Sequence, residues 1–164
     1  MLVVTSLAGN IFSDKRLARK YKREKAAGNC EQLFVSRMEM ERLRLRRKTN
    51  KGTDIGLVFE PGNRLHHGDL LAAEKFIVVN QLPEKVIIVR IQKGDFGKMV
   101  RAATLIGHMI GNRHRPIAVD HHSITFPIQS ESEVDIFRKL LPATIKLQVK
   151  EQVFIPTSEA HSHD

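Results

Sequence analysis

The spacing of the apolar residues changes once along this chain of 164 residues, and that change limits the possible folds more than any other feature. From residue 33 to residue 79, apolar and polar side chains alternate, which is the period of β-strands. Beyond residue 80 the apolar residues follow both strand and helix spacings. We therefore expect two domains, a small all-β domain followed by an α+β domain.

The first domain is expected over residues 1–80. Met38 and Met40 alternate with glutamates, and Leu43 and Leu45 alternate with arginines. The apolar positions shift from even to odd numbers between Met40 and Leu43, as a one-residue β-bulge would produce. Turn-forming residues at 49–52, 60–63 and 67–69 separate these runs, and 75–79 reads as another strand. Short strands with regular turns indicate an all-β domain.

The second domain is expected over residues 83–152, followed by a flexible tail over 153–164. Asp95 is a suitable N-cap for its first helix, and Gly111-Asn112 is a suitable stop. Ser130 and Glu133 have the spacing of a capping box for its second helix, which ends before Pro142. The expected elements are a strand at 86–91, a helix at 96–110, strands at 116–119 and 124–128, a helix at 131–141 and a strand at 145–150. The order β-α-β-β-α-β is that of the ferredoxin-like fold.

The net charge of +9 is concentrated in one part of the chain. Residues 13–51 hold 14 lysines and arginines against 5 acidic residues, so the rest of the chain is neutral overall. The most basic stretch, Asp14 to Asn29, has only a narrow apolar pairing of Leu17 with Tyr21. It predicts either a solvated helix or mobile arm, or a patch that binds an anion or a partner.

Composition excludes several classes of protein. Cys30 is the single cysteine, so an internal disulfide framework and cysteine-based zinc motifs are excluded. The sequence has no apolar run long enough to span a membrane and no signal peptide, which predicts a cytoplasmic protein without a membrane partner. It also lacks a phosphate-binding loop, a nucleophile motif and HExxH, so we do not expect an enzyme.

Histidine is the residue type that offers chemistry here, with eight copies. His161 and His163 lie two residues apart, so on an extended chain both imidazoles point to one side and can hold nickel, copper or zinc; the alternative is a merely disordered end. The pairs His66-His67 and His121-His122 lie in expected turns, and His108 lies between core positions of a helix. For these we weigh a solvated or packing role against a ligand role.

One motif resembles a known family. Gly111-Asn112-Arg113-His114, followed by Pro116, resembles the signature of the UreE family of urease accessory proteins, which are nickel metallochaperones. The stretch from Arg46 to Leu71 resembles the peptide-binding β-domain of that family, and 154–156 with the histidine-ending tail resembles its C-terminus.

The resemblance implies a homodimer joined through the second domain, with His114 of each subunit binding nickel and His161 and His163 adding ligands. It implies delivery of nickel to the urease apoprotein, together with urease accessory proteins that include a GTPase. Copper or zinc would bind the same imidazoles in vitro.

The family pattern differs from this chain at three points. Some members have further histidines at the positions of Met109, Ile128 and Ser130, and the tail here has only two histidines. These differences predict few nickel ions per dimer.

Two other functions remain open at this stage. A basic arm beside a ferredoxin-like domain also occurs in nucleic-acid-binding proteins, although the chain outside residues 13–51 is neutral overall and the second domain lacks the aromatic run of an RNA-recognition motif. A metal-dependent hydrolase is the other, although no carboxylate base accompanies the histidines.

Overall fold

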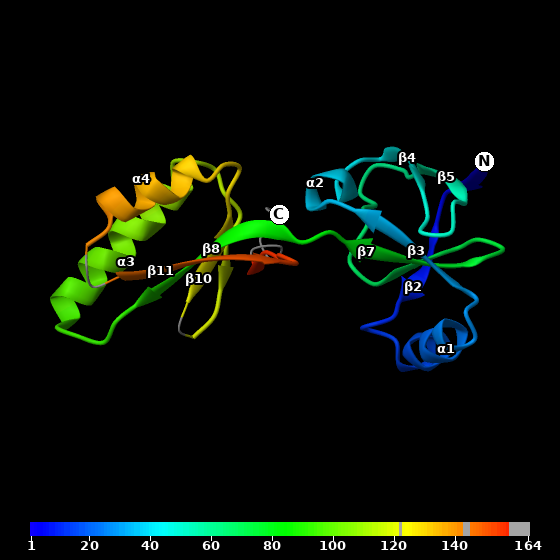
Figure 1. Cartoon of the computed structure of the whole chain (residues 1–164), viewed down its shortest axis with the longest axis horizontal. Helices are drawn as coiled ribbons and strands as arrows, with labels where there is room; N and C mark the ends of the chain where they lie inside the picture. Colours follow the sequence, from blue (N-terminus) through cyan, green and yellow to red (C-terminus); the bar gives the residue numbers. More distant parts are fainter. Residues whose placement is uncertain (122, 143–144, 158–164) are drawn as a thin grey trace. The chain divides into compact units, whose positions relative to one another are not determined.

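The computed structural model describes residues 1–121, 123–142 and 145–157. The chain divides into two compact units, Met1–Leu82 and Pro83–Asp164 (Figure 1). Within the described ranges, none of the helices has the length and apolar character that crossing a membrane requires.

The first unit contains two sheets and two helices. Its smaller sheet has the strand order β1-β5-β4, and its larger sheet has the order β2-β6-β7-β3. The main core holds apolar side chains from both sheets, such as Ile55 and Leu57 from β5 and Leu33 and Val35 from β3. The elements are β1 Leu2–Val4, β2 Leu7–Asn10, α1 Lys15–Ala26, β3 Cys30–Val35, α2 Arg37–Met40, β4 Arg44–Lys48, β5 Asp54–Val58, β6 Asp69–Leu71 and β7 Phe76–Gln81.

The second unit is one four-stranded sheet with two helices, in the expected order β-α-β-β-α-β. The sheet order is β11-β8-β10-β9, and all neighbouring strands are antiparallel. Both helices lie on the same side of the sheet (Figure 1). The elements are β8 Glu84–Ile91, α3 Phe96–Gly111, β9 Ala118–Val119, β10 Ile124–Pro127, α4 Ser132–Leu140 and β11 Ile145–Gln152.

Strand β8 is buried on both faces, which explains its continuous apolar run. Ile87 and Val89 belong to the core beneath the helices, whereas Val86 and Ile88 pack against Phe154 on the other face. Phe154 is fully buried, so the segment after β11 covers the sheet face that the helices leave open. This packing holds the start of the C-terminal segment against the sheet.

Several local predictions are confirmed. Asp95 caps α3 by accepting a hydrogen bond from the Lys98 N–H. The turn at 49–52 joins β4 to β5 as an antiparallel hairpin, and Gly52 takes the left-handed backbone (φ 83°) that glycine tolerates best.

The prediction of an all-β first unit is wrong because the unit contains helices. Residues 37–40, predicted as part of a bulged strand, form the short helix α2. Ser36 and Glu39 form a complete capping box at its start, in which each side chain pairs with the backbone of the other residue. Four residues in which apolar and polar side chains alternate are also compatible with one turn of helix. Here the capping box stabilises the helix.

The basic stretch from Asp14 to Asn29 contains an ordered helix, α1 (Lys15–Ala26), and Asp14 is its N-cap. Leu17 and Tyr21 pack against Ile11, Cys30 and neighbouring apolar side chains of the larger sheet. The helix is therefore docked on its unit through the narrow apolar pairing seen in the sequence.

The capping box predicted for α4 is only half formed. Glu133 accepts a hydrogen bond from the Ser130 N–H, but the Ser130 hydroxyl contacts Ser132 and no side chain caps the helix. Glu133 also accepts from the Gln129 N–H, and it pairs with Arg115, which the cap motif does not reveal.

A buried carboxylate ties the larger sheet to the β4–β5 hairpin. Glu31 on β3 accepts hydrogen bonds from the Thr49 hydroxyl (2.6 Å) and from Lys75 Nζ (2.8 Å). Burial alone raises the pKa of Glu31, but the bonds from Lys75, Thr49 and Thr53 outweigh it and lower the pKa to about 2. The ionised form is therefore part of the folded structure.

Acidification should destabilise the first unit through Glu31. Because the pKa is lower in the folded state, the stabilisation is complete above the ordinary pKa of about 4.5 and is lost as the pH falls towards 2. The loss should reach about 3 kcal/mol for this residue. Thermal melting over this pH range measures it. Glu31→Gln should reduce the dependence by the share of this residue, whereas the exposed control Glu60→Gln should leave it unchanged. An unchanged slope in Glu31→Gln would refute this account.

Candidate metal site at the end of helix α3

Helix α3 ends in a left-handed turn at His114. This residue has φ 48°, and it is the single non-glycine residue with positive φ among the described residues. Its N–H donates to the Gly111 carbonyl (2.9 Å), and the Arg115 N–H donates to the Ile110 carbonyl (3.4 Å). These two bonds form a Schellman motif, in which glycine usually takes the left-handed position. The expected stop residues Gly111 and Asn112 therefore precede the residue that turns the chain.

The arginines on both sides of His114 are anchored to helix α4. The Arg113 guanidinium lies over the Phe137 ring, 5.2 Å from its centroid, and its Nη1 donates to the Met109 carbonyl. Arg115 Nη2 donates to both carboxylate oxygens of Glu133, at 3.0 and 2.9 Å. The Arg115 and Glu133 side chains are mostly buried, which makes their charge-assisted pair expensive to break.

His114 itself is exposed, and the side chains of its two neighbours, Arg113 and Arg115, are held by contacts within the second unit. The backbone that carries its imidazole is therefore fixed, while the ring can reach a ligand outside the unit. A neutral imidazole is a good ligand for nickel, copper and zinc. Within residues 1–121, 123–142 and 145–157, no three His, Cys, Asp or Glu side chains gather as a metal site.

The tail histidines His161 and His163 lie outside the described residues, as does His122. The chain leading to the tail is held beside the segment that follows His114. The Thr157 N–H donates to the Ile117 carbonyl (2.9 Å), and the Thr157 hydroxyl accepts from the Val119 N–H (2.7 Å). Thr157, the last described residue before the tail, is thus hydrogen-bonded to a residue three positions along the chain from His114.

The remaining described histidines have different surroundings. His108 is exposed on the last turn of α3, with its Nε2 2.9 Å from the Asn112 side-chain nitrogen. His66 and His121 are exposed. His67 is half-buried, its Nδ1 accepts the Gln81 N–H, and burial lowers its pKa. The solvated reading therefore fits His66 but is wrong for His67.

Met109 and Ile128, at two of the positions where the resemblance led us to expect histidine in some family members, are both buried in the core of the second unit. Sequence reasoning missed the anchoring roles of Arg113, Arg115 and Glu133. The capping-box signal at Glu133 pointed to its backbone partners only, because the pairing with Arg115 spans 18 residues.

Comparison with known proteins gives a consistent result. The family model for the N-terminal domain of the UreE urease accessory protein matches residues 5–80. The chain is 26% identical to a urease accessory protein UreE of Natronomonas pharaonis, over 98% of this chain and 80% of that protein. It is 25% identical to a urease accessory protein UreE 1 of Pseudomonas syringae pv. tomato, over 87% and 93% respectively. A Haemophilus influenzae UreE is 31% identical over 59% of this chain and 51% of that protein.

These matches define an accessory protein with a role in urease maturation, not an enzyme. The chain is similar to UreE urease accessory proteins over most of its length, and residues 5–80 match the model of their N-terminal domain. The resemblance inferred from the Gly111 to His114 motif is thus confirmed by matches that cover most of the chain.

Replacement of His114 tests the left-handed turn. The variant His114→Gly should be more stable than His114→Ala by about 1 kcal/mol, because a left-handed backbone is strained for alanine and free for glycine. Thermal melting of the two variants beside the unaltered protein measures the difference. Equal stability of the two variants, or a more stable alanine variant, would show that the residue is not left-handed in solution.

Proposed function

We propose that the chain is a cytoplasmic nickel metallochaperone that delivers Ni(II) to apo-urease. In this proposal two copies form a homodimer through ferredoxin-like second domains, and His114 of each copy binds the nickel ion. The observation that carries the proposal is the exposed imidazole of His114 on a fixed left-handed turn. A two-fold axis doubles a single ligand, so each copy needs to supply only half of the central site.

The tail supplies further ligands, His161 and His163, in this proposal. Thr157 is hydrogen-bonded to Ile117, which is three residues along the chain from His114. An extended chain spans about 3.5 Å per residue, so the four residues from Thr157 to His161 span up to about 14 Å. The tail is therefore long enough to bring an imidazole to a metal ion bound at His114.

The two kinds of ligand have different entropic costs. The backbone of His114 is already fixed, whereas a tail histidine must be ordered before it can bind, which costs free energy. His114 is thus the anchor ligand, and the tail imidazoles capture and release the ion. Exchangeable ligands suit a protein that must pass its cargo to a partner, here the urease apoprotein and the accessory GTPase. Copper should bind the same imidazoles at least as strongly, so the selection of nickel comes from the pathway.

Nickel titration of designed variants tests this order of ligands. In calorimetry of the full chain, His114→Gly should weaken the tightest site by more than the 10- to 100-fold typical of losing an outer-shell partner. Glycine suits the left-handed turn, so the fold and the dimer should persist in sedimentation. Deleting residues 161–164 should weaken binding less.

The exposed histidine His66 provides the matched control, because His66→Ala removes one imidazole from the first unit and should leave the titration unchanged. Unaltered tight binding in His114→Gly would refute His114 as a ligand. A larger loss on tail deletion than in His114→Gly would make His161 and His163 the primary site instead.

A further inference from the structure

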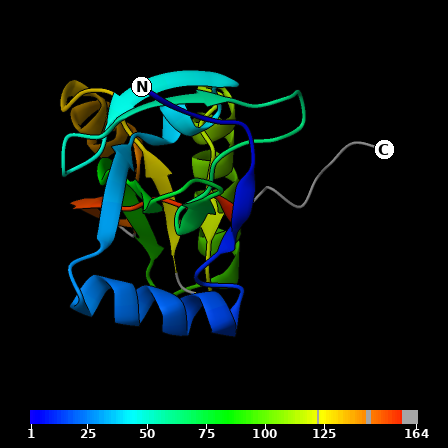
Figure 2. The same ribbon diagram turned by 90° about the vertical axis from the view of Figure 1, so that its right-hand side faces the viewer.

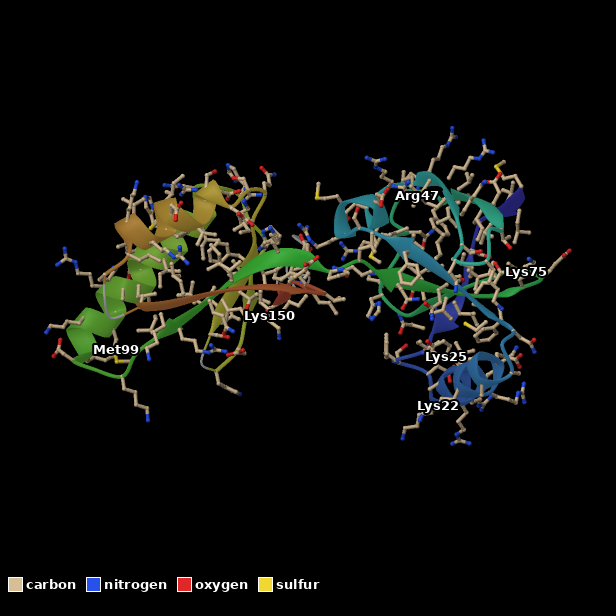
Figure 3. All side chains as sticks on the ribbon, in the orientation of Figure 1. Lys22, Lys25, Arg47, Lys75, Met99 and Lys150 are labelled. Carbon is tan, nitrogen blue, oxygen red and sulfur yellow. The ribbon has the colours of Figure 1, made fainter. Side chains whose placement is uncertain are left out.

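Helix α1 presents a dense cationic surface that nickel binding does not use. Seven of its twelve residues are lysine or arginine, all seven are exposed, and Glu24 is its single acid. The half-buried residues Leu17, Ala18, Tyr21 and Glu24 lie along the opposite face, towards the sheet. Nitrogen-tipped side chains extend outwards from α1, with Lys22 and Lys25 labelled in Figure 3. The helix lies at the edge of its unit in both Figure 1 and Figure 2.

The charges within the helix are poorly compensated. Arg23 pairs with Glu24, and Lys20 and Lys25 lie over aromatic rings, each 5.4 Å from the ring centroid. Four further cations have no acidic partner among the described residues: Lys15, Arg16, Arg19 and Lys22. These four cations are therefore available to attract an anionic surface.

The placement of these charges works against the helix itself. Arg19 has like charges at both helical spacings, Lys15 four residues before it and Lys22 three residues after it, and such pairs destabilise a helix. Lys15 and Arg16 also occupy the first turn, where the helix dipole disfavours cations. Lys15, Arg16, Arg19 and Lys22 therefore add nothing to the stability of α1 through charge pairing or the helix dipole, which indicates a role in recognition.

The cations are held on a rigid frame. The Asp14 carboxylate accepts from the Arg16 and Leu17 N–H groups at the start of the helix. Leu17 and Tyr21 then dock the helix on the apolar side chains of Ile11 and Cys30. A fixed array of charge steers association and adds selectivity more than it adds affinity.

The same packing distinguishes between anionic partners. A membrane-surface helix buries an apolar face in the bilayer, but the apolar side chains of α1 already pack on their own unit. Binding to single-stranded nucleic acid uses aromatic stacking, and Tyr21, the single aromatic residue of α1, is turned towards the sheet beneath Lys25. An acidic protein surface needs neither feature, and proteins are the partners that a role in urease maturation requires.

We propose that α1 is a docking element for an acidic face of a protein in the urease maturation machinery. The contact is made by Lys15, Arg16, Arg19 and Lys22, and it speeds association with that partner. This inference rests on the family role in urease maturation and does not depend on the nickel ligands.

A charge-neutral variant tests the proposal. The probe is the complex of apo-urease with its accessory proteins from the same source, and the readout is the association rate at several salt concentrations. Replacing Lys15, Arg16, Arg19 and Lys22 with glutamine should lower the rate at low salt at least tenfold and flatten its salt dependence. The nickel titration should remain unchanged, which separates this inference from the proposed metal site.

The matched control removes four positive charges from the second unit, by replacing Lys93, Lys98, Lys146 and Lys150 with glutamine. It should keep most of the rate. Equal losses in both variants would show that only net charge matters and would overturn the proposal.

A competition experiment on the unaltered protein covers the case in which the variant folds poorly. Excess polyglutamate should slow association with the urease complex, and no effect would overturn the proposal. Binding to a single-stranded RNA of 20 nucleotides and to phosphatidylserine vesicles is measured in parallel. If the α1 variant lost binding to either of these but kept the urease-complex rate, the partner would be nucleic acid or membrane and the proposal would be wrong.

Discussion

The left-handed turn at His114 is the constraint on which the candidate site depends. Two backbone hydrogen bonds end helix α3 there, and they require a positive φ at a residue that carries a side chain. That conformation is strained for any residue but glycine, so the surrounding contacts must hold it. The stacking of Arg113 on Phe137 and the pairing of Arg115 with Glu133 supply those contacts from α4. The imidazole is thus held in place from outside its own helix.

The rest of the second unit supports the same geometry. Strand β8 is buried on both faces and carries α3 on one of them, while Phe154 closes the other. The bonds of Thr157 to Ile117 and Val119 then fix where the chain leaves the sheet. The same packed sheet therefore positions both helix α3, which carries His114 at its end, and Thr157, the last described residue before the tail. The proposed docking role of α1 concerns the first unit alone and rests on different residues, the exposed cations of that helix.

The fold was predictable from the sequence wherever a pattern ran long enough. The helix after Asp95 and the strand at 145–150 were both predicted correctly. The helical spacing extends over more than two turns, and the strand alternation extends over several pairs of residues. The stretch around Met38 and Met40 was misread because four alternating residues cannot distinguish a strand from one helical turn. The Ser36 and Glu39 capping box held the missing information.

The candidate site was predictable in part. Its central residue, His114, was identified from the motif that begins at Gly111. Its left-handed backbone was not predicted, because the left-handed residue at a helix end is usually glycine or asparagine. The Arg115 and Glu133 pair is a tertiary contact, which depends on how α3 and α4 pack and not on any local pattern. His67 was read as solvated because burial by Phe12 and the bond from Gln81 are likewise non-local.

The central claim is that His114 binds nickel from its fixed turn, and diffraction at the nickel absorption edge tests it most directly. Crystals of the full chain grown with nickel should give an anomalous peak at bonding distance from the His114 imidazoles of two copies, with φ of His114 still positive. A nickel peak confined to other histidines, with both His114 imidazoles uncoordinated, would contradict the account.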